Sequence, residues 1–266
     1  MTAESKMRLV KPSRRLLGLF DTYLRWYLRR HFHGLRVAHG ERFPRDAAGA
    51  LIVYLNHPSW WDPLTCIMIS RRFLPQADHN APMDESALER YGFFAKMGLF
   101  PVERKTSRGA MQFVRYSMRV LATPGSVLWL TPEGRFADPR AQPPVFKDGM
   151  ASLLARVPCA TLLPLAIEYV FWDERLPEIL VNCGEAISID DGDKYEASHW
   201  SDVLGRALGR TQEELAALAV ARDPTKFEAV LAGGAGIGFA YDLMKRIGSL
   251  ARGEQYAAEH GSLRRP

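Results

Sequence analysis

The sequence predicts an α/β fold in which helices flank a mixed central sheet, with an amphipathic helix at the N-terminus and a helical extension at the C-terminus. Short runs rich in Val, Ile and Leu occupy residues 50–56, 126–131 and 161–169, and such runs are typical of buried strands. Segments with helical spacing alternate with these runs, as in sheets that are covered by helices. The 266 residues are enough for one such domain with helical additions.

The remaining elements follow from the same patterns. Further strands are expected over residues 99–103 and 178–187, and a polar, proline-rich loop over 137–145. Helices are expected over residues 11–36, 59–72, 108–121 and 147–156, and from about 196 to the end of the chain. We therefore divide the chain into a basic amphipathic segment (1–40), an α/β domain (41–195) and a helical C-terminal extension (196–266).

Composition excludes several classes of protein. A hydrophobic content of 47% and a charged content of 24% are ordinary for a globular protein. No uninterrupted apolar run approaches the roughly 18 residues of a membrane-spanning helix, and no signal peptide is recognisable. The cysteines, which we expect to be buried and reduced, have no metal-type spacing, and the histidines form no ligand pattern. No zinc-finger or RNA-recognition signature accompanies the basic charge, so nucleic-acid binding is not expected. The cysteines are Cys66, Cys159 and Cys183.

The most informative motif is the run NHPSWWD at residues 56–62, directly after the first expected strand. His57 would emerge at the carboxyl end of that strand, where open α/β folds place their ligands. A histidine there can accept a proton from a hydroxyl near neutral pH, and the carboxylate of Asp62 can orient the imidazole and stabilise its charged form. On an unbroken helix the two side chains would point about 140° apart, but Pro58 favours a turn at His57. The alternative is a helix-capping aspartate beside an unrelated histidine.

Three further blocks follow the first in the chain. They are GLFPVER at 98–104, SVLWLTPEGR at 126–135, and the strand-like stretch 157–167 with its internal proline. With NHPSWWD, these blocks resemble the four ordered motifs of the glycerolipid acyltransferase superfamily, whose familiar members are lysophosphatidic acid acyltransferases. The resemblance covers roughly residues 50–168.

The resemblance implies a role for individual residues. It implies that His57 is the general base and that Asp62 is its orienting partner. Acyl transfer from a thioester needs an activated hydroxyl, a site for the developing oxyanion and cationic contacts for any phosphate. Arginine suits the last task because its planar guanidinium binds two oxygens at once. The substrate-binding residues that the resemblance implies are Arg104 for the acceptor's phosphate, Glu133 and Gly134 for the acceptor, and Pro164 for the acyl-donor side.

The third block departs from the family pattern. The family commonly has an arginine two places beyond the glycine, whereas here Arg135 follows Gly134 directly and Phe136 occupies the usual arginine position. Either Arg135 reaches the same phosphate from a shifted turn, or the acceptor differs from the usual glycerol phosphate. Lys147 is a candidate for a substitute charge, and its alternative interpretation is a solvated residue at the start of a helix.

These observations indicate an O-acyltransferase of phospholipid biosynthesis, with 1-acylglycerol-3-phosphate or a related lysophospholipid as the expected acceptor. The donor is acyl-CoA or an acyl carrier protein, and the sequence does not choose between them. Two alternatives remain open: an acyltransferase for a non-phosphate acceptor such as a glycolipid or an amino-acid lipid, and a non-catalytic peripheral lipid-binding protein. No cofactor or metal is expected.

The segment 11–36 carries seven Lys or Arg residues and one acid. Its apolar residues follow helical spacing, and an apolar face beside a cationic face with aromatic rings favours an anionic membrane surface. The alternative is a basic helix that packs on its own domain. We expect a peripheral protein on the cytoplasmic face of a membrane. The apolar stripe comprises Leu16, Phe20, Tyr23 and Tyr27, joined by Leu17, Leu24 and Leu28.

Overall fold

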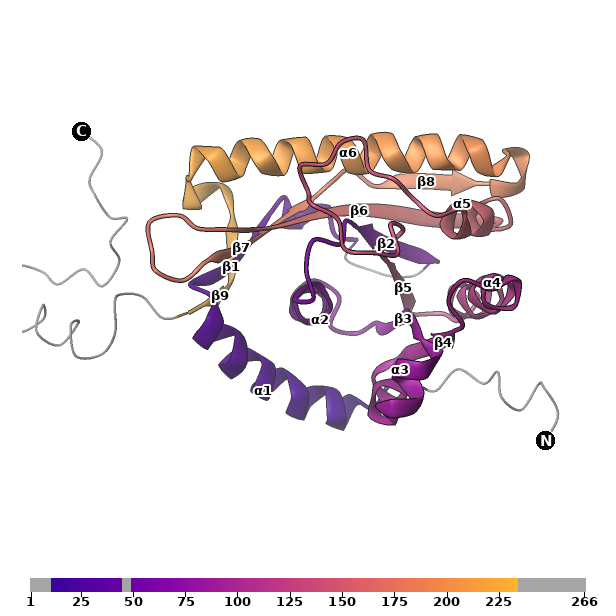
Figure 1. Cartoon of the computed structure of the whole chain (residues 1–266), viewed down its shortest axis with the longest axis horizontal. Coiled ribbons are helices and arrows are strands. Elements are labelled where there is room, and N and C mark those ends of the chain that lie inside the picture. The colour runs from indigo at the N-terminus through magenta and orange to yellow at the C-terminus, as the bar shows by residue number, and fades with distance from the viewer. Residues whose placement is uncertain (1–10, 45–48, 234–266) are drawn as a thin grey trace, which may run out of the picture.

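The computed structural model describes residues 11–44 and 49–233, which build a central sheet with helices on both faces (Figure 1). The sheet has nine strands in the order β4-β3-β5-β2-β6-β7-β1-β9, and β8 pairs with β6. The strands are β1 Gly34–Ala38, β2 Leu51–Leu55, β3 Asp78–Asp84, β4 Leu99–Val102, β5 Ser126–Leu130, β6 Cys159–Val170, β7 Glu178–Cys183, β8 Ile187–Asp190 and β9 Glu228–Ala232. The helices are α1 Arg14–His31, α2 Asp62–Phe73, α3 Glu85–Arg90, α4 Ser107–Leu121, α5 Asp148–Leu154 and α6 Ala197–Ala221, and 3-10 turns include η2 Gly40–Arg42 and η3 Gly92–Met97.

Parallel and antiparallel pairs coexist in the sheet. The strands β4, β3, β5, β2 and β6 run parallel to one another, whereas β7 and β8 are antiparallel to β6 and β9 is antiparallel to β1. The predicted fold class, a mixed sheet flanked by helices, is therefore confirmed.

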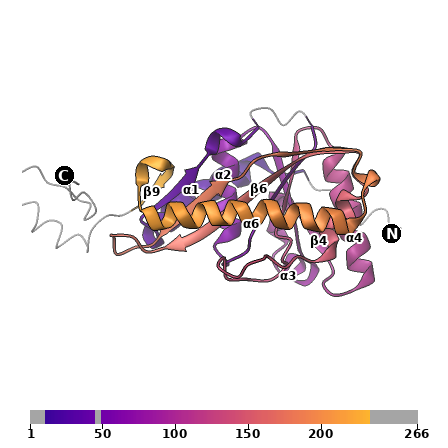
Figure 2. The ribbon, with the colours of Figure 1, turned by 90° about the horizontal axis from the view of Figure 1, so that it is seen from above.

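Strand β2 shows why the strands at the centre read as continuous apolar runs. All five of its residues are buried, because helices cover both faces of the sheet. Leu51, Val53 and Leu55 belong to the core that α1 and α2 cover. Ile52 and Tyr54 belong to the core that α4, α5 and α6 cover. Seen from above, α6 lies along the length of this second face (Figure 2).

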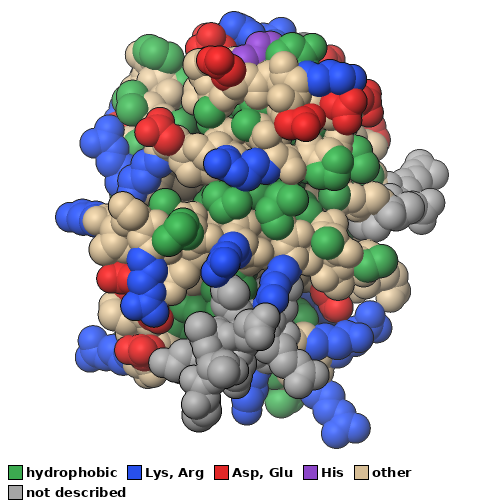
Figure 3. Space-filling view, turned by 90° about the vertical axis from the view of Figure 1, so that its right-hand side faces the viewer, with side chains coloured by type: hydrophobic (Ala, Val, Ile, Leu, Met, Phe, Trp, Pro, Cys, Tyr) green, Lys and Arg blue, Asp and Glu red, His purple; other side chains and the backbone are tan. Residues whose placement is uncertain are grey.

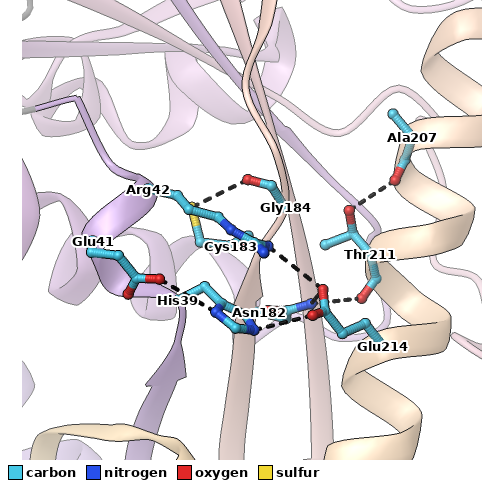
Figure 4. Close-up of polar contacts among 9 residues, drawn as sticks. All are labelled: His39, Glu41, Arg42, Asn182, Cys183, Gly184, Ala207, Thr211 and Glu214. Carbon is cyan, nitrogen blue, oxygen red and sulfur yellow. Dashed lines mark hydrogen bonds and ion pairs between the residues drawn. The ribbon is translucent and has the colours of Figure 1, made fainter.

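Helix α6 is tied to the sheet by polar contacts as well as by its apolar face (Figure 4). Asn182 of β7 donates hydrogen bonds through Nδ2 to the Thr211 carbonyl at 3.1 Å and to Glu214 Oε2 at 2.9 Å. His39 Nε2 lies 3.1 Å from Glu214 Oε1, and Arg42 Nη1 lies 3.6 Å from Glu214 Oε2. This part of the predicted C-terminal extension therefore packs as one layer of the domain.

Several predicted boundaries were wrong. The helix expected over 11–36 ends at His31, and Gly34 begins a strand in the sheet. The extension is not helical throughout, because Arg222 adopts a left-handed conformation (φ 51°) after α6 and β9 follows. The remainder of the extension, residues 234–266, lies outside the described residues. The strand expected over 178–187 is two strands, separated at Gly184, where a Cβ atom would lie 2.3 Å from Thr211 Oγ1.

The three cysteines are free thiols, but they are not all buried as predicted. Cys183 is buried, Cys66 is half-buried and Cys159 is exposed. In residues 11–44 and 49–233, no helix combines the length and the apolar character that crossing a bilayer requires.

Candidate active site

The end of strand β2 is held in place by the side chain of Asn56. Its Nδ2 donates to the Ile167 carbonyl at 3.0 Å, and the Ile167 N–H donates to its Oδ1 at 2.8 Å. The amide thus continues the β2–β6 ladder for one more position, and it is almost fully buried. This fixes the point at which the chain leaves the sheet, immediately before His57.

The structure brings His57 and Asp62 into contact. His57 Nδ1 lies 2.6 Å from Asp62 Oδ2, which also accepts the Ser59 N–H at 3.0 Å. The chain turns between the two residues, and α2 begins at Asp62 rather than near Ser59 as predicted. Because a carboxylate only accepts, Nδ1 donates this hydrogen bond, and in the neutral ring Nε2 then carries the lone pair. That arrangement leaves Nε2 able to take a proton from a substrate hydroxyl.

Tyr169 is a further partner of Asp62 that the sequence analysis did not identify. Its hydroxyl donates to Asp62 Oδ1 at 2.6 Å and lies 3.3 Å from Thr65 Oγ1. Burial, followed by the nearby Asp62 charge, raises the pKa of Tyr169, so the hydroxyl stays protonated and remains a donor. Asp62, only 1% exposed, is therefore hydrogen-bonded through both oxygens. Tyr169 lies two residues beyond the fourth block, and no local pattern marks it.

Two hydrogen bonds with the turn after β5 hold the backbone of His57 in place. The His57 N–H donates to Glu133 Oε2 at 2.7 Å, and the His57 carbonyl accepts the Ala137 N–H at 3.0 Å. Glu133 is buried, and burial raises its pKa, although the hydrogen bond from the His57 amide opposes that shift. In this geometry Glu133 holds the backbone of His57. The acceptor-binding role that the resemblance implies for Glu133 stays a prediction.

Two cationic side chains converge on the carbonyl oxygen of Gly134. Arg104 Nη2 donates to it at 3.0 Å and Lys147 Nζ donates to it at 3.3 Å. Gly134 has a left-handed φ of 58°, a backbone conformation that favours glycine. The Arg104 side chain is 58% exposed and lies 3.8 Å from Asp84. An anionic group of a ligand can therefore reach both cations.

The two residues that depart from the family pattern lie on the same turn. Arg135 is exposed and close enough to Glu133 to influence its pKa. The Phe136 ring lies 4.6 Å from the His57 ring between centroids, and it is 60% exposed. Lys147, rather than Arg135, joins Arg104 at the Gly134 carbonyl.

Pro164 is the one predicted site residue that lies apart from this group. It is buried in β6, opposite Tyr54 in the parallel pairing, and its carbonyl accepts the Gly184 N–H at 2.9 Å.

A pocket of about 560 Å³ opens beside His57 and Asp62. It follows α2 past Cys66 and Ile67, and its other walls come from α1, β3, β5 and the segment before β4. Apolar side chains from several of these elements line it: Leu17, Leu55, Ile67, Met97, Leu99, Trp129 and Leu130.

His79 is a second titratable ring in the wall of this pocket, and burial keeps it neutral. Trp129 Nε1 donates to His79 Nδ1 at 3.0 Å, and His79 Nε2 lies 3.0 Å from the Leu74 carbonyl. Burial lowers the pKa of His79 to about 4. An uncharged and fully paired imidazole suits a wall that faces an apolar ligand. Within the described residues, no group of three or more His, Cys, Asp or Glu side chains is placed to hold a metal ion.

Comparison with known proteins agrees with this geometry. A family model described as Acyltransferase matches residues 34–168, just over half of the 266-residue chain. The chain belongs to this acyltransferase family. Membership supports acyltransferase activity and implies an acyl donor and a lipid acceptor as partners. No curated protein matches the chain.

Proposed function

We propose that this protein transfers a fatty acyl group from an acyl thioester to a hydroxyl of a lysophospholipid such as 1-acylglycerol-3-phosphate. The observation that carries the proposal is the 2.6 Å contact between His57 and Asp62 at the mouth of a largely apolar pocket. His57 Nε2 takes the proton of the acceptor hydroxyl while that oxygen forms a bond to the thioester carbonyl carbon. The carbon–sulfur bond then breaks, and the thiolate leaves with the proton from the imidazolium.

The pocket along α2 is suited to the acyl chain. It begins at the catalytic pair and continues between α2 and the sheet, so a thioester carbonyl near His57 directs its chain inward. Each methylene removed from water contributes about 0.8 kcal/mol. The neutral His79 adds no charge of its own to that wall.

Arg104 and Lys147 are suited to the acceptor's phosphate. In the structure both donate to the Gly134 carbonyl, which a phosphate oxygen replaces as a stronger, charged acceptor. Lys147 then supplies the charge that the family's usual arginine supplies, since Phe136 stands at that position. This proposal keeps a phosphorylated acceptor despite the altered third block.

The outer face of α1 supports contact with an anionic membrane surface. The predicted apolar stripe is divided, because Leu24 and Leu28 are buried in the core of the domain. Leu19, Tyr23 and Trp26 point outward instead, with exposed fractions of 75%, 52% and 54%. Exposed cations flank them: Arg15, Arg29 and Arg30. Aromatic rings beside arginines are typical of side chains that lie at the headgroup level of a bilayer.

Trp61 links this face to the active-site turn. Its ring contacts Tyr27 and Phe32 of the α1 region, with centroids 5.6 Å and 4.8 Å away. It also stacks on Trp60, which is 55% exposed. A lipid acceptor that lies in the membrane is thereby brought close to His57.

The proposal is tested by turnover of the purified full-length chain with labelled palmitoyl thioester and a panel of acceptors. We expect acylation of 1-acylglycerol-3-phosphate or another lysophospholipid. Acylation confined to an unphosphorylated glycolipid or amino-acid lipid would contradict the phosphate site. It would still be consistent with acyl transfer. A wild-type protein that acylates none of them would favour a lipid-binding role without catalysis.

A further inference from the structure

The chain contains one long stretch that is free of acidic residues. Residues 104–132 include five Lys or Arg residues and no Asp or Glu, although the whole chain carries 30 acids against 35 cations. The net charge of this stretch, +5, equals that of the entire chain. Basic charge is therefore concentrated around α4 as well as in the segment 11–36.

These cations form a stripe along the solvent side of α4. The inner side of the helix is buried through Tyr116, Ser117 and Val120. Residues spaced by three, four or seven positions share a helix face, and the exposed residues of α4 follow that spacing. Among the exposed residues of α4, those with large side chains are Arg108, Met111, Arg115 and Arg119, and Lys105 lies just before the helix. Figure 3 views the side of the molecule on which α4 lies, and Lys and Arg side chains are spread widely over the middle and lower parts of that face.

The stripe starts at the candidate active site. Arg104, which donates to the Gly134 carbonyl, lies just before α4. The helix has 15 residues and therefore runs for roughly 21 Å away from that point. Glu103 Oε2 lies 4.0 Å from Arg108 Nε, and Asp84 Oδ2 lies 3.8 Å from Arg104 Nε. The side chains of Arg108 and Arg104 are nevertheless 72% and 58% exposed. A partner that lies along α4 would have one end next to the site of acyl transfer.

We propose that the exposed face of α4 is the docking surface for an acidic carrier protein that delivers the acyl group as a thioester on its prosthetic arm. The inference rests on the proposed function and selects the donor that the sequence leaves open. A row of arginines along a rigid helix matches an extended acidic surface, such as a carboxylate-rich helix. A soluble CoA thioester is small, and its phosphates need cations near the pocket mouth rather than along the whole helix.

A membrane is the less suitable partner for this face. Interfacial helices carry aromatic anchors between their cations. On α4 the exposed large apolar side chain is Met111, whereas the exposed rings of Tyr23 and Trp26 lie on α1. The two helices thus present different surfaces, one suited to a bilayer and one to an acidic protein.

The test compares two donors with the same palmitoyl chain, one on CoA and one on a purified bacterial acyl carrier protein. Reversing two charges far from Arg104, in Arg115→Glu with Arg119→Glu, should raise KM for the carrier-bound donor by about 10-fold or more. KM for palmitoyl-CoA and kcat with either donor should stay within about twofold of wild type. Raising the salt concentration should weaken the wild-type chain's use of the carrier-bound donor and bring it towards the variant.

The matched control reverses two exposed arginines on α6, Arg206→Glu with Arg210→Glu, and should leave both donors unaffected. If charge reversal impairs folding, the milder double variant Arg115→Gln with Arg119→Gln replaces it in the same measurements. In parallel, binding of the carrier protein to the wild-type chain is measured by titration, with expected loss in the α4 variant.

Absence of carrier binding by the wild-type chain, or equal effects of the α4 variant on both donors, would overturn the docking surface. Weaker binding to anionic vesicles with unchanged use of the carrier-bound donor would assign α4 to the membrane and overturn it as well. Wild-type turnover with palmitoyl-CoA alone rejects the carrier and leaves the proposed function intact. Absence of turnover with both donors would contradict the proposed function itself.

Discussion

Replacing Tyr169 by phenylalanine isolates the contribution of the second donor to Asp62. The substitution removes only the hydroxyl that donates to Asp62 Oδ1 at 2.6 Å and keeps the ring. A hydrogen bond to a charged group contributes about 1.5–3 kcal/mol, which corresponds to roughly 10- to 150-fold in rate if it acts wholly in the transition state. Asp62 keeps its contacts with His57 and Ser59, so we expect the lower end, a loss of about 10-fold in kcat with little change in acceptor KM.

The matched control is Tyr54→Phe. Its hydroxyl is also buried and donates to the Leu204 carbonyl at 3.3 Å, but its ring lies in the core on the α6 side of the sheet. This variant should lose about 1 kcal/mol of stability and keep its kcat. Steady-state kinetics and thermal unfolding of both variants provide the measurement. Tyr169→Phe with wild-type kcat, or equal kinetic losses in both variants, would refute the reasoning about Asp62.

Three further predictions concern other parts of the molecule. Arg104→Ala and Lys147→Ala should each raise KM for a phosphorylated acceptor by roughly 10-fold or more and leave KM for the acyl donor unchanged; unchanged acceptor KM in both variants would sink the phosphate site. Trp26→Ser should weaken sedimentation with anionic liposomes without lowering thermal stability, and equal sedimentation would remove this residue from the membrane surface. His33 Nδ1 lies 2.5 Å from Glu178 Oε1, and this hydrogen bond raises the pKa of His33 above 6.5. The stabilisation is therefore complete below pH 6.5 and is lost as the pH rises through the raised pKa, so the stability advantage of wild type over His33→Gln should shrink in alkaline buffer.

The central strands could be predicted from the sequence because burial on both faces leaves a purely apolar run, as in β2. Strand β3 escaped prediction because it contains Asp78, His79 and Asn80 and a proline, which are unusual in a strand with neighbours on both sides. The amphipathic character of α1 was visible, but which stripe packs inward depends on the sheet beneath it.

The candidate site, too, could be predicted only in part from the sequence. The turn at Pro58 indicated that His57 and Asp62 can meet, and the structure places them in contact. Tyr169 and Asn56 could not be found in the same manner, because their partners lie 107 and 111 positions away in the chain. Such contacts exist only after β2 and β6 have paired, so they belong to tertiary structure rather than to local pattern.

The most direct measurement of the proposed chemistry is turnover of His57→Ala with a labelled acyl thioester and a lysophospholipid. Loss of the general base should lower kcat by about 10²- to 10⁴-fold, or roughly 3–5 kcal/mol of barrier, while thermal unfolding remains cooperative. His199→Ala, which alters an exposed histidine on α6, is the matched control and should retain wild-type rates. A folded His57→Ala protein whose kcat stays within about threefold of wild type would contradict the assignment of His57 as the base.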